Sequence, residues 1–147
     1  MGTRKLKNPE MLGKSKRAYF SAAKALSDLS DYPFPIGCVV VHRHRIISSG
    51  YNSKNNRHGY QARLDKQYYN VESIGCKHAE MDALLPFLKN TQLDISQATI
   101  YIYRQNKLGK KLLARPCPIC MSVIKKLGIK RIEYTTDLGF ASEVLKY

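Results

Sequence analysis

Hydrophobic positions at helical spacing predict three helices in this chain. Apolar residues three or four positions apart form one face over residues 15–29, which predicts the first helix. A second stripe predicts a helix over residues 78–89, in which Pro86 should cause a kink or an early end. The third helix should begin at residues 116–118, because proline suits a first helical turn, and end at Gly128, since glycine readily forms a left-handed cap.

Short runs rich in β-branched and aromatic residues predict strands between these helices. Four such runs cover residues 36–41, 45–49, 98–104 and 130–135. The first two are separated by three residues and should pair as a hairpin, whereas the third should lead through a turn into a short return segment at residues 111–114. The C-terminal residues 140–147 fit either an edge strand or a short helix.

The order of these elements predicts the fold class. Helices and strands alternate in a way that indicates an α/β domain with helices packed on one mixed sheet. The chain has 147 residues, a length typical of one domain. We assign that domain to residues 15–147, behind a basic tail over residues 1–14 that we expect to be frayed. Residues 50–75 lack clear periodicity and should form a long loop containing a helical turn at most.

Composition limits the classes of protein to which the chain can belong. The hydrophobic share of 44% is ordinary for a globular core and argues against a disordered chain. The apolar runs are too short to cross a bilayer, and no export signal follows the first methionine, so we expect a cytoplasmic protein with no membrane partner. In that compartment, four cysteines indicate metal or catalytic chemistry more than disulfides.

The chain is strongly basic, with 25 Lys and Arg residues against 11 Asp and Glu residues and a net charge of +14. Such a field should attract phosphate groups, whether on a free nucleotide or along single-stranded DNA or RNA. A solvated surface that the charge keeps soluble is an equally good explanation. The charge therefore indicates the sign of a binding partner but not its identity.

Two short motifs contain residues that can bind a metal ion and transfer protons. His78 and Glu80 lie at one predicted helix start, and Cys117 and Cys120 lie at another. Cysteines three positions apart face the same side of a helix and, with His78, could hold one tetrahedral zinc ion with one position vacant, as a catalytic site requires. A hydrolytic zinc site also needs a group that moves protons, and Glu80 is placed beside a ligand to do so.

The remaining cysteines and one histidine have alternative interpretations. Cys76 could complete a closed Cys₃His site, in which zinc would only stabilise the fold. Cys38 lies in an apolar run and is expected to be a buried small hydrophobic residue. His58 could assist a second zinc ion, contact a phosphate, or be an ordinary surface residue.

The two motifs together resemble the zinc-dependent cytidine and deoxycytidylate deaminase superfamily. Residues 35–41 and 50–52 are similar to the segment before the zinc helix in deoxycytidylate and tRNA-adenosine deaminases, so the resemblance spans roughly residues 36–134. It implies a three-layer α/β/α fold with a mixed sheet of about five strands and helices on both faces. It also implies Zn²⁺ as the cofactor and assembly into a homo-oligomer.

The same resemblance implies roles for individual residues. His78, Cys117 and Cys120 would hold the zinc, and Glu80 would be the catalytic residue that protonates the ring nitrogen and then the departing ammonia. Contacts with the substrate are implied at Asn52 and at the backbone of Ala79. We also predict contacts at Pro116 and at Tyr51, which could stack on a base or simply close the loop over the core. Without the resemblance, Asn52 would be interpreted as an ordinary turn residue.

Three hypotheses about function follow. The first is hydrolytic deamination of cytosine in a nucleotide, such as dCMP to dUMP. The second is deamination of cytosine or adenine in single-stranded DNA or RNA, including tRNA, for which the net charge and the tyrosines of the long loop are the basis. The third is a non-catalytic zinc module.

Arg104 and Arg115 flank an inserted hairpin before the second motif and could contact a phosphate or simply face solvent.

Overall fold

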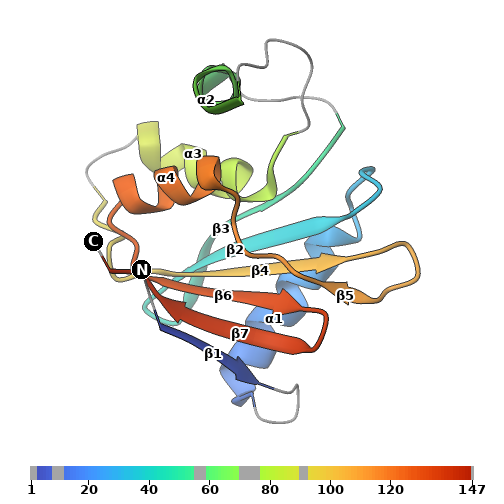
Figure 1. Cartoon of the computed structure of the whole chain (residues 1–147). Helices are drawn as coiled ribbons and strands as arrows, with labels where there is room; N and C mark the ends of the chain where they lie inside the picture. Colours follow the sequence, from blue (N-terminus) through green and yellow to red (C-terminus); the bar gives the residue numbers. More distant parts are fainter. Residues whose placement is uncertain (1–2, 8–11, 55–58, 70–76, 90–92, 147) are drawn as a thin grey trace.

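The computed structural model describes residues 3–7, 12–54, 59–69, 77–89 and 93–146, which form one mixed β-sheet flanked by helices (Figure 1). The strands are β1 (Thr3–Lys7), β2 (Ile36–His42), β3 (Arg45–Tyr51), β4 (Thr99–Gln105), β5 (Lys111–Leu112), β6 (Arg131–Thr136) and β7 (Gly139–Val144). The helices are α1 (Lys14–Ser27), α2 (Gly59–Tyr69), α3 (Ala79–Lys89) and α4 (Pro118–Lys126). The strand order is β1-β7-β6-β4-β2-β3, and the short β5 pairs with the end of β4.

Helices cover both faces of the sheet (Figure 1). α1 packs against β2 and β4 on one face, whereas α3 and α4 lie on the other. β4 and β6 run parallel and are joined through α4, so α4 begins beyond the carboxyl end of β4. The other strand pairs described are antiparallel. The predicted three-layer α/β/α fold is confirmed, with β1 and β5 as short additions to the sheet.

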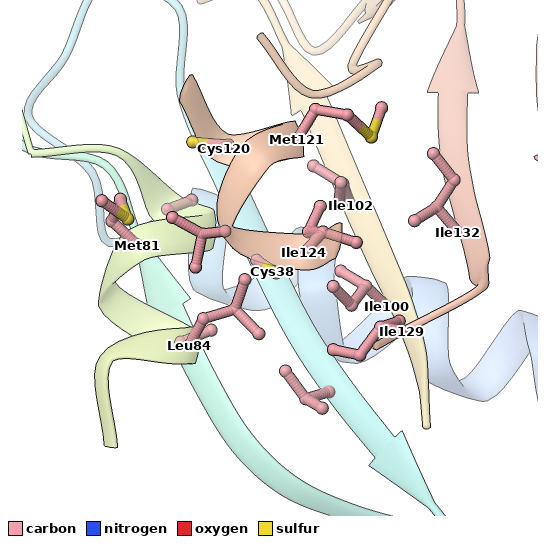
Figure 2. Close-up of a cluster of buried hydrophobic side chains, with 14 of the residues drawn as sticks. Cys38, Met81, Leu84, Ile100, Ile102, Cys120, Met121, Ile124, Ile129 and Ile132 are labelled. Carbon is pink, nitrogen blue, oxygen red and sulfur yellow. The ribbon is translucent and has the colours of Figure 1, made fainter. Parts of the chain in front are cut away.

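The central strands place alternate side chains on opposite faces, as a pleated strand requires. In β2, Val39 and Val41 join the core under α1, whereas Cys38 and Val40 join the core under α3 and α4. Figure 2 shows the second of these cores, in which side chains from β2, β4 and β6 meet those of α3 and α4. Two hydrophobic cores therefore hold the helices on the sheet.

Gly50 allows α3 to approach β3 closely. A Cβ atom at this position would lie 2.6 Å from the carbonyl oxygen of Ala79 and 2.7 Å from the backbone nitrogen of Ala83. Both distances are too short for real atoms, so only glycine fits between the strand and the helix. This contact fixes the first turn of α3 against the sheet.

Most of the predicted elements are confirmed to within two residues. Gly128 follows α4 with a φ of +76°, the left-handed cap that was predicted. Arg43 and His44 link β2 and β3 with φ values of 51° and 66°, which is typical of a two-residue hairpin turn. The C-terminal segment is a strand, β7, although β1 covers it and forms the edge of the sheet.

The expectation of a frayed N-terminal tail was wrong for Thr3–Lys7. These residues form β1, which pairs with β7 in antiparallel register from Thr3 opposite Val144 to Lys7 opposite Phe140. The backbone of β7 would otherwise present unpaired hydrogen-bonding groups along its outer side. Charged residues suit an edge strand, so the basic composition that suggested a tail is compatible with β1.

Two helices also differ from the prediction. The long loop over residues 50–75 contains α2, an eleven-residue helix and not a single turn. α3 continues through Pro86 to Lys89, so the early end did not occur. Pro86 is exposed and lies in the last turn of α3. Few helical hydrogen bonds lie beyond it, so the donor that proline lacks costs the helix little. No helix among the residues described is both long and apolar enough to span a membrane.

Candidate active site

Three ligand atoms converge where α3 and α4 begin. His78 precedes α3, Cys117 is the N-cap residue of α4, and Cys120 lies in the first turn of α4. The Nδ1 atom of His78 lies 3.3 Å from the Sγ atom of Cys120 and 3.6 Å from that of Cys117. All three ligand atoms lie within 4.8 Å of one another. The fold thus brings together the three residues that were predicted to bind a metal ion.

The spacing of these atoms fits zinc. With Zn–S bonds of about 2.3 Å and Zn–N bonds of about 2.0–2.1 Å, tetrahedral geometry puts neighbouring nitrogen and sulfur ligands about 3.5 Å apart. The observed nitrogen–sulfur distances of 3.3 and 3.6 Å lie on either side of this value. Thiolate and imidazole are also the ligand types that zinc prefers, and three of them leave one of four positions for water or substrate.

The two helix N-termini favour negatively charged ligands. The carbonyl of His78 accepts the first helical hydrogen bond of α3 from Asp82, and the carbonyl of Cys117 accepts that of α4 from Met121. Both helices therefore begin at the site, and their N-terminal partial positive charge favours thiolate over thiol. A hydrogen bond from the Cys120 thiol lowers the pKa of Cys117 to about 4. The same hydrogen bond, together with burial, raises the pKa of Cys120, so Cys117 is the residue that supplies negative charge before a metal cation binds.

Glu80 lies in the first turn of α3, and only 5% of its surface is exposed. It lines the same cavity as His78 and Cys117, although residues two apart face different sides within a regular helix. The exception arises because His78 stands just outside the helix. Burial raises the pKa of the Glu80 carboxyl, and the nearby charge of His78 opposes this effect. A carboxyl group in such surroundings is suited to accepting and returning a proton.

A cavity of about 230 Å³ lies beside the ligands. His78, Glu80 and Cys117 form part of its wall. The rest of the wall consists of Tyr32, Ile36, Asn52, Arg104, Leu113, Ala114 and Arg115. A concave, largely apolar surface with a few polar groups is typical of a small-molecule site. Sequence reasoning did not find Tyr32, Ile36, Leu113 or Ala114, because no motif marks them.

Asn52 is buried in the wall of this cavity, and its side chain holds the segment before β2. Its Oδ1 atom accepts hydrogen bonds from Ser30 Oγ at 2.6 Å and from the Ile36 backbone nitrogen at 2.8 Å. Its Nδ2 atom donates to the Phe34 carbonyl at 3.0 Å. Asn52 therefore shapes the cavity, and its contact with substrate stays a prediction. The other predicted contacts, Tyr51, Ala79 and Pro116, are not part of the cavity wall and also stay predictions.

Gln61 of α2 is a supporting residue that sequence reasoning missed. It is fully buried, and its Oε1 atom accepts a hydrogen bond of 3.0 Å from the backbone nitrogen of His78. The preceding residue, Lys77, exchanges two backbone hydrogen bonds with Ser53, at 2.8 and 3.1 Å. These contacts fix the backbone of a metal ligand from two sides. A single glutamine in a segment without periodicity gives no signal from which this role could be inferred.

Cys38 is confirmed as a buried small hydrophobic residue. It belongs to the core under α3 and α4, and burial raises the pKa of its thiol well above the usual value, so the thiol remains neutral. Cys76 and His58 lie outside the described residues, and so do the side chains of Tyr60, Tyr68 and Tyr69. The proposals made for these residues stay predictions.

Comparison with known proteins connects this site to one family. The model of the cytidine and deoxycytidylate deaminase zinc-binding region matches residues 14–136. No curated protein matches the sequence significantly. A similar solved structure is dCMP deaminase from the cyanophage S-TIM5 in complex with dCMP and dUMP, with 22% identity, a TM-score of 0.57, and coverage of 89% of this chain and 85% of that chain.

Two cytidine deaminases are also similar. The enzyme from Burkholderia pseudomallei has 22% identity and a TM-score of 0.52, with 80% of each chain covered. The enzyme from Mycobacterium leprae has 18% identity and a TM-score of 0.51, with 85% of this chain and 90% of that chain covered. At these identities the likeness establishes a shared fold. The family match, by contrast, includes all three candidate ligands and Glu80.

We expect the purified protein to contain one zinc ion per chain. Cys117→Ala should lower zinc affinity by more than the roughly 10- to 100-fold that is typical of losing a group outside the coordination sphere, because it removes a ligand. Cys38→Ala is the matched control, since it removes a buried thiol that is not a ligand, and it should keep its zinc. Elemental analysis and competition with a chelator would measure both, and full zinc affinity in Cys117→Ala would contradict this site.

A second prediction concerns the hydrogen bond from Gln61 to His78. Gln61→Met keeps the volume of the side chain but removes the acceptor of the part-buried backbone N–H of His78, which should lower the free energy of unfolding by about 0.5–1.5 kcal/mol. Gln67→Met changes an exposed glutamine of the same helix and should have little effect. Denaturant unfolding of the zinc-loaded proteins measures the difference, and equal stability of the two variants would show that the hydrogen bond is unimportant.

Proposed function

Because the chain belongs to the cytidine and deoxycytidylate deaminase family, a family of zinc-dependent hydrolases, we propose that it deaminates cytosine in a free nucleotide such as dCMP. The products would be the corresponding uracil nucleotide and ammonia. The observation that carries the proposal is a single cavity whose wall includes the metal ligands His78 and Cys117 together with the buried carboxyl of Glu80. A closed structural zinc site has no use for such a carboxyl group.

We assign roles to the residues as follows. His78, Cys117 and Cys120 hold the zinc, which when bound supplies an activated water as the nucleophile for the amine-bearing carbon. The Glu80 carboxylate accepts the proton that the water loses and delivers a proton to the ring nitrogen. Glu80 then takes the second proton of the added water oxygen and passes it to the exocyclic nitrogen. The carbon–nitrogen bond breaks, ammonia leaves, and the ring carbon becomes a carbonyl. Because Glu80 is buried, few water molecules compete for these protons.

One observation favours a free nucleotide as the substrate. The cyanophage dCMP deaminase, whose fold this chain shares, was solved with dCMP and dUMP. A single-stranded nucleic acid is the second candidate because the net charge of +14 would attract a polyanion. Salt dependence distinguishes the two candidates.

Glu80→Gln should slow ammonia release about 10²- to 10⁴-fold, because the amide keeps the size of the side chain but cannot relay protons. The variant should retain its zinc, since no ligand changes. Glu133→Gln is the control: it alters another buried carboxylate, paired with Lys16 at 2.7 Å and outside the cavity wall, and should remain active. Normal turnover by zinc-loaded Glu80→Gln would refute the proton-relay role.

The substrate class is tested by measuring ammonia release from deoxycytidine, dCMP and short single-stranded oligonucleotides over a range of salt concentrations. We expect dCMP to be turned over with a shallow dependence on salt, since it carries one phosphate. A polymer with several phosphates neutralised by the protein would lose affinity with a log–log slope of about −0.7 per contact. Turnover of oligonucleotides with a steep slope, and none of dCMP, would favour the second candidate.

A further inference from the structure

Two arginines line the cavity, and their partners differ. Arg115 forms a two-pronged ion pair with Glu143, in which Nε donates at 3.0 Å and the terminal nitrogen donates at 2.8 Å. Glu143 also accepts a hydrogen bond of 3.1 Å from the hydroxyl of Tyr134. The charge of Arg115 is therefore compensated by a carboxylate that the fold holds in place.

Arg104 lacks such compensation. It lies near the end of β4, where one terminal nitrogen donates to the Leu113 carbonyl at 3.1 Å and the guanidinium lies over the ring of Phe34, 5.2 Å from its centre. Its Nε atom is buried and has no hydrogen-bond partner among the described residues. No ion pair links Arg104 to a carboxylate in the same part of the chain. Arg104 is half-buried and lines the cavity, so its positive charge is available to an anionic ligand there.

The groups that line the cavity differ in burial. Glu80 is only 5% exposed, whereas Arg104 is half-buried and packs on Phe34, which is 46% exposed. A nucleotide bound with its base at the zinc site would direct its 5′-phosphate outward. A phosphate at this position would need a hydrogen-bond donor, and Arg104, whose charge no carboxylate compensates among the described residues, can supply one.

We infer that Arg104 recognises the 5′-phosphate of the nucleotide and makes the enzyme prefer a monophosphate over a nucleoside. This inference rests on the proposed deaminase function. A planar guanidinium held by one carbonyl and one aromatic ring is preorganised, so its free N–H groups can bind phosphate oxygens with little loss of side-chain freedom. Arg115 has a different role: with Glu143, it fixes the chain immediately before Cys117.

The experiment compares kcat/KM for dCMP with kcat/KM for deoxycytidine in the wild type, Arg104→Gln and Arg104→Lys. The ratio should fall about 10- to 100-fold in Arg104→Gln, the range expected for losing a charge-assisted hydrogen bond. Arg104→Lys keeps the charge but not the planar fork, so its ratio should lie in between. Lys110→Gln removes the same charge from an exposed position on the same hairpin, outside the cavity wall, and should keep the wild-type ratio.

Inorganic phosphate provides a second measurement. It should inhibit the wild type competitively against dCMP and inhibit Arg104→Gln much less. If Arg104 only anchors the hairpin through Leu113, its variants should lose activity on both substrates equally, and that result would overturn the inference. An unchanged ratio would overturn it as well. If the wild type releases ammonia from neither substrate, the proposed function itself fails, which is a distinguishable outcome.

Discussion

The site depends on one constraint of chain direction within the sheet. β3 and β4 both pair with β2 in antiparallel orientation. They therefore run in the same direction, and their carboxyl ends lie at the same end of the sheet. α3 begins beside this end of the strands, because Lys77, just before the helix, pairs with Ser53, just beyond β3. α4 begins there as well, because it follows β4 in the chain. Two helix N-termini therefore meet at one place. This arrangement joins His78 to Cys117 across 39 positions of sequence.

The same arrangement should couple the fold to its cofactor. Burying thiolates and a carboxyl group is costly unless opposite charge compensates them. Helix N-termini supply part of that charge and bound zinc would supply the rest, so we expect metal binding to contribute to folding. Two close contacts support the site. Gly50 lets α3 pack directly on the sheet, and Gln61 accepts a hydrogen bond from the backbone of His78. Both would be difficult to replace without moving a ligand.

The parts of the molecule that have local signals could be predicted from the sequence. Periodicity located α1, α3 and α4, and the ligand motifs led to the family that the comparison then confirmed. β1 and α2 were missed because their stability comes from tertiary contacts, the exposed side of β7 and the buried Gln61, and not from their own patterns. The distinction between Arg104 and Arg115 likewise required the position of Glu143, which is 28 residues from Arg115.

The location of the positive charge bears on the choice between a nucleotide and a polymer. The basic runs at residues 42–45 and 125–131 lie at the opposite end of the strands from the cavity, because β2 ends and β3 and β6 begin there. The first half of α1 is at that end too, since Tyr19 donates to the carbonyl of His44. A single strand entering the cavity would need a continuous basic path leading to it. These two runs provide a long-range field. At the cavity end the basic residues include those of the hairpin between β4 and β5 and also Arg104, for which we propose a contact with one phosphate.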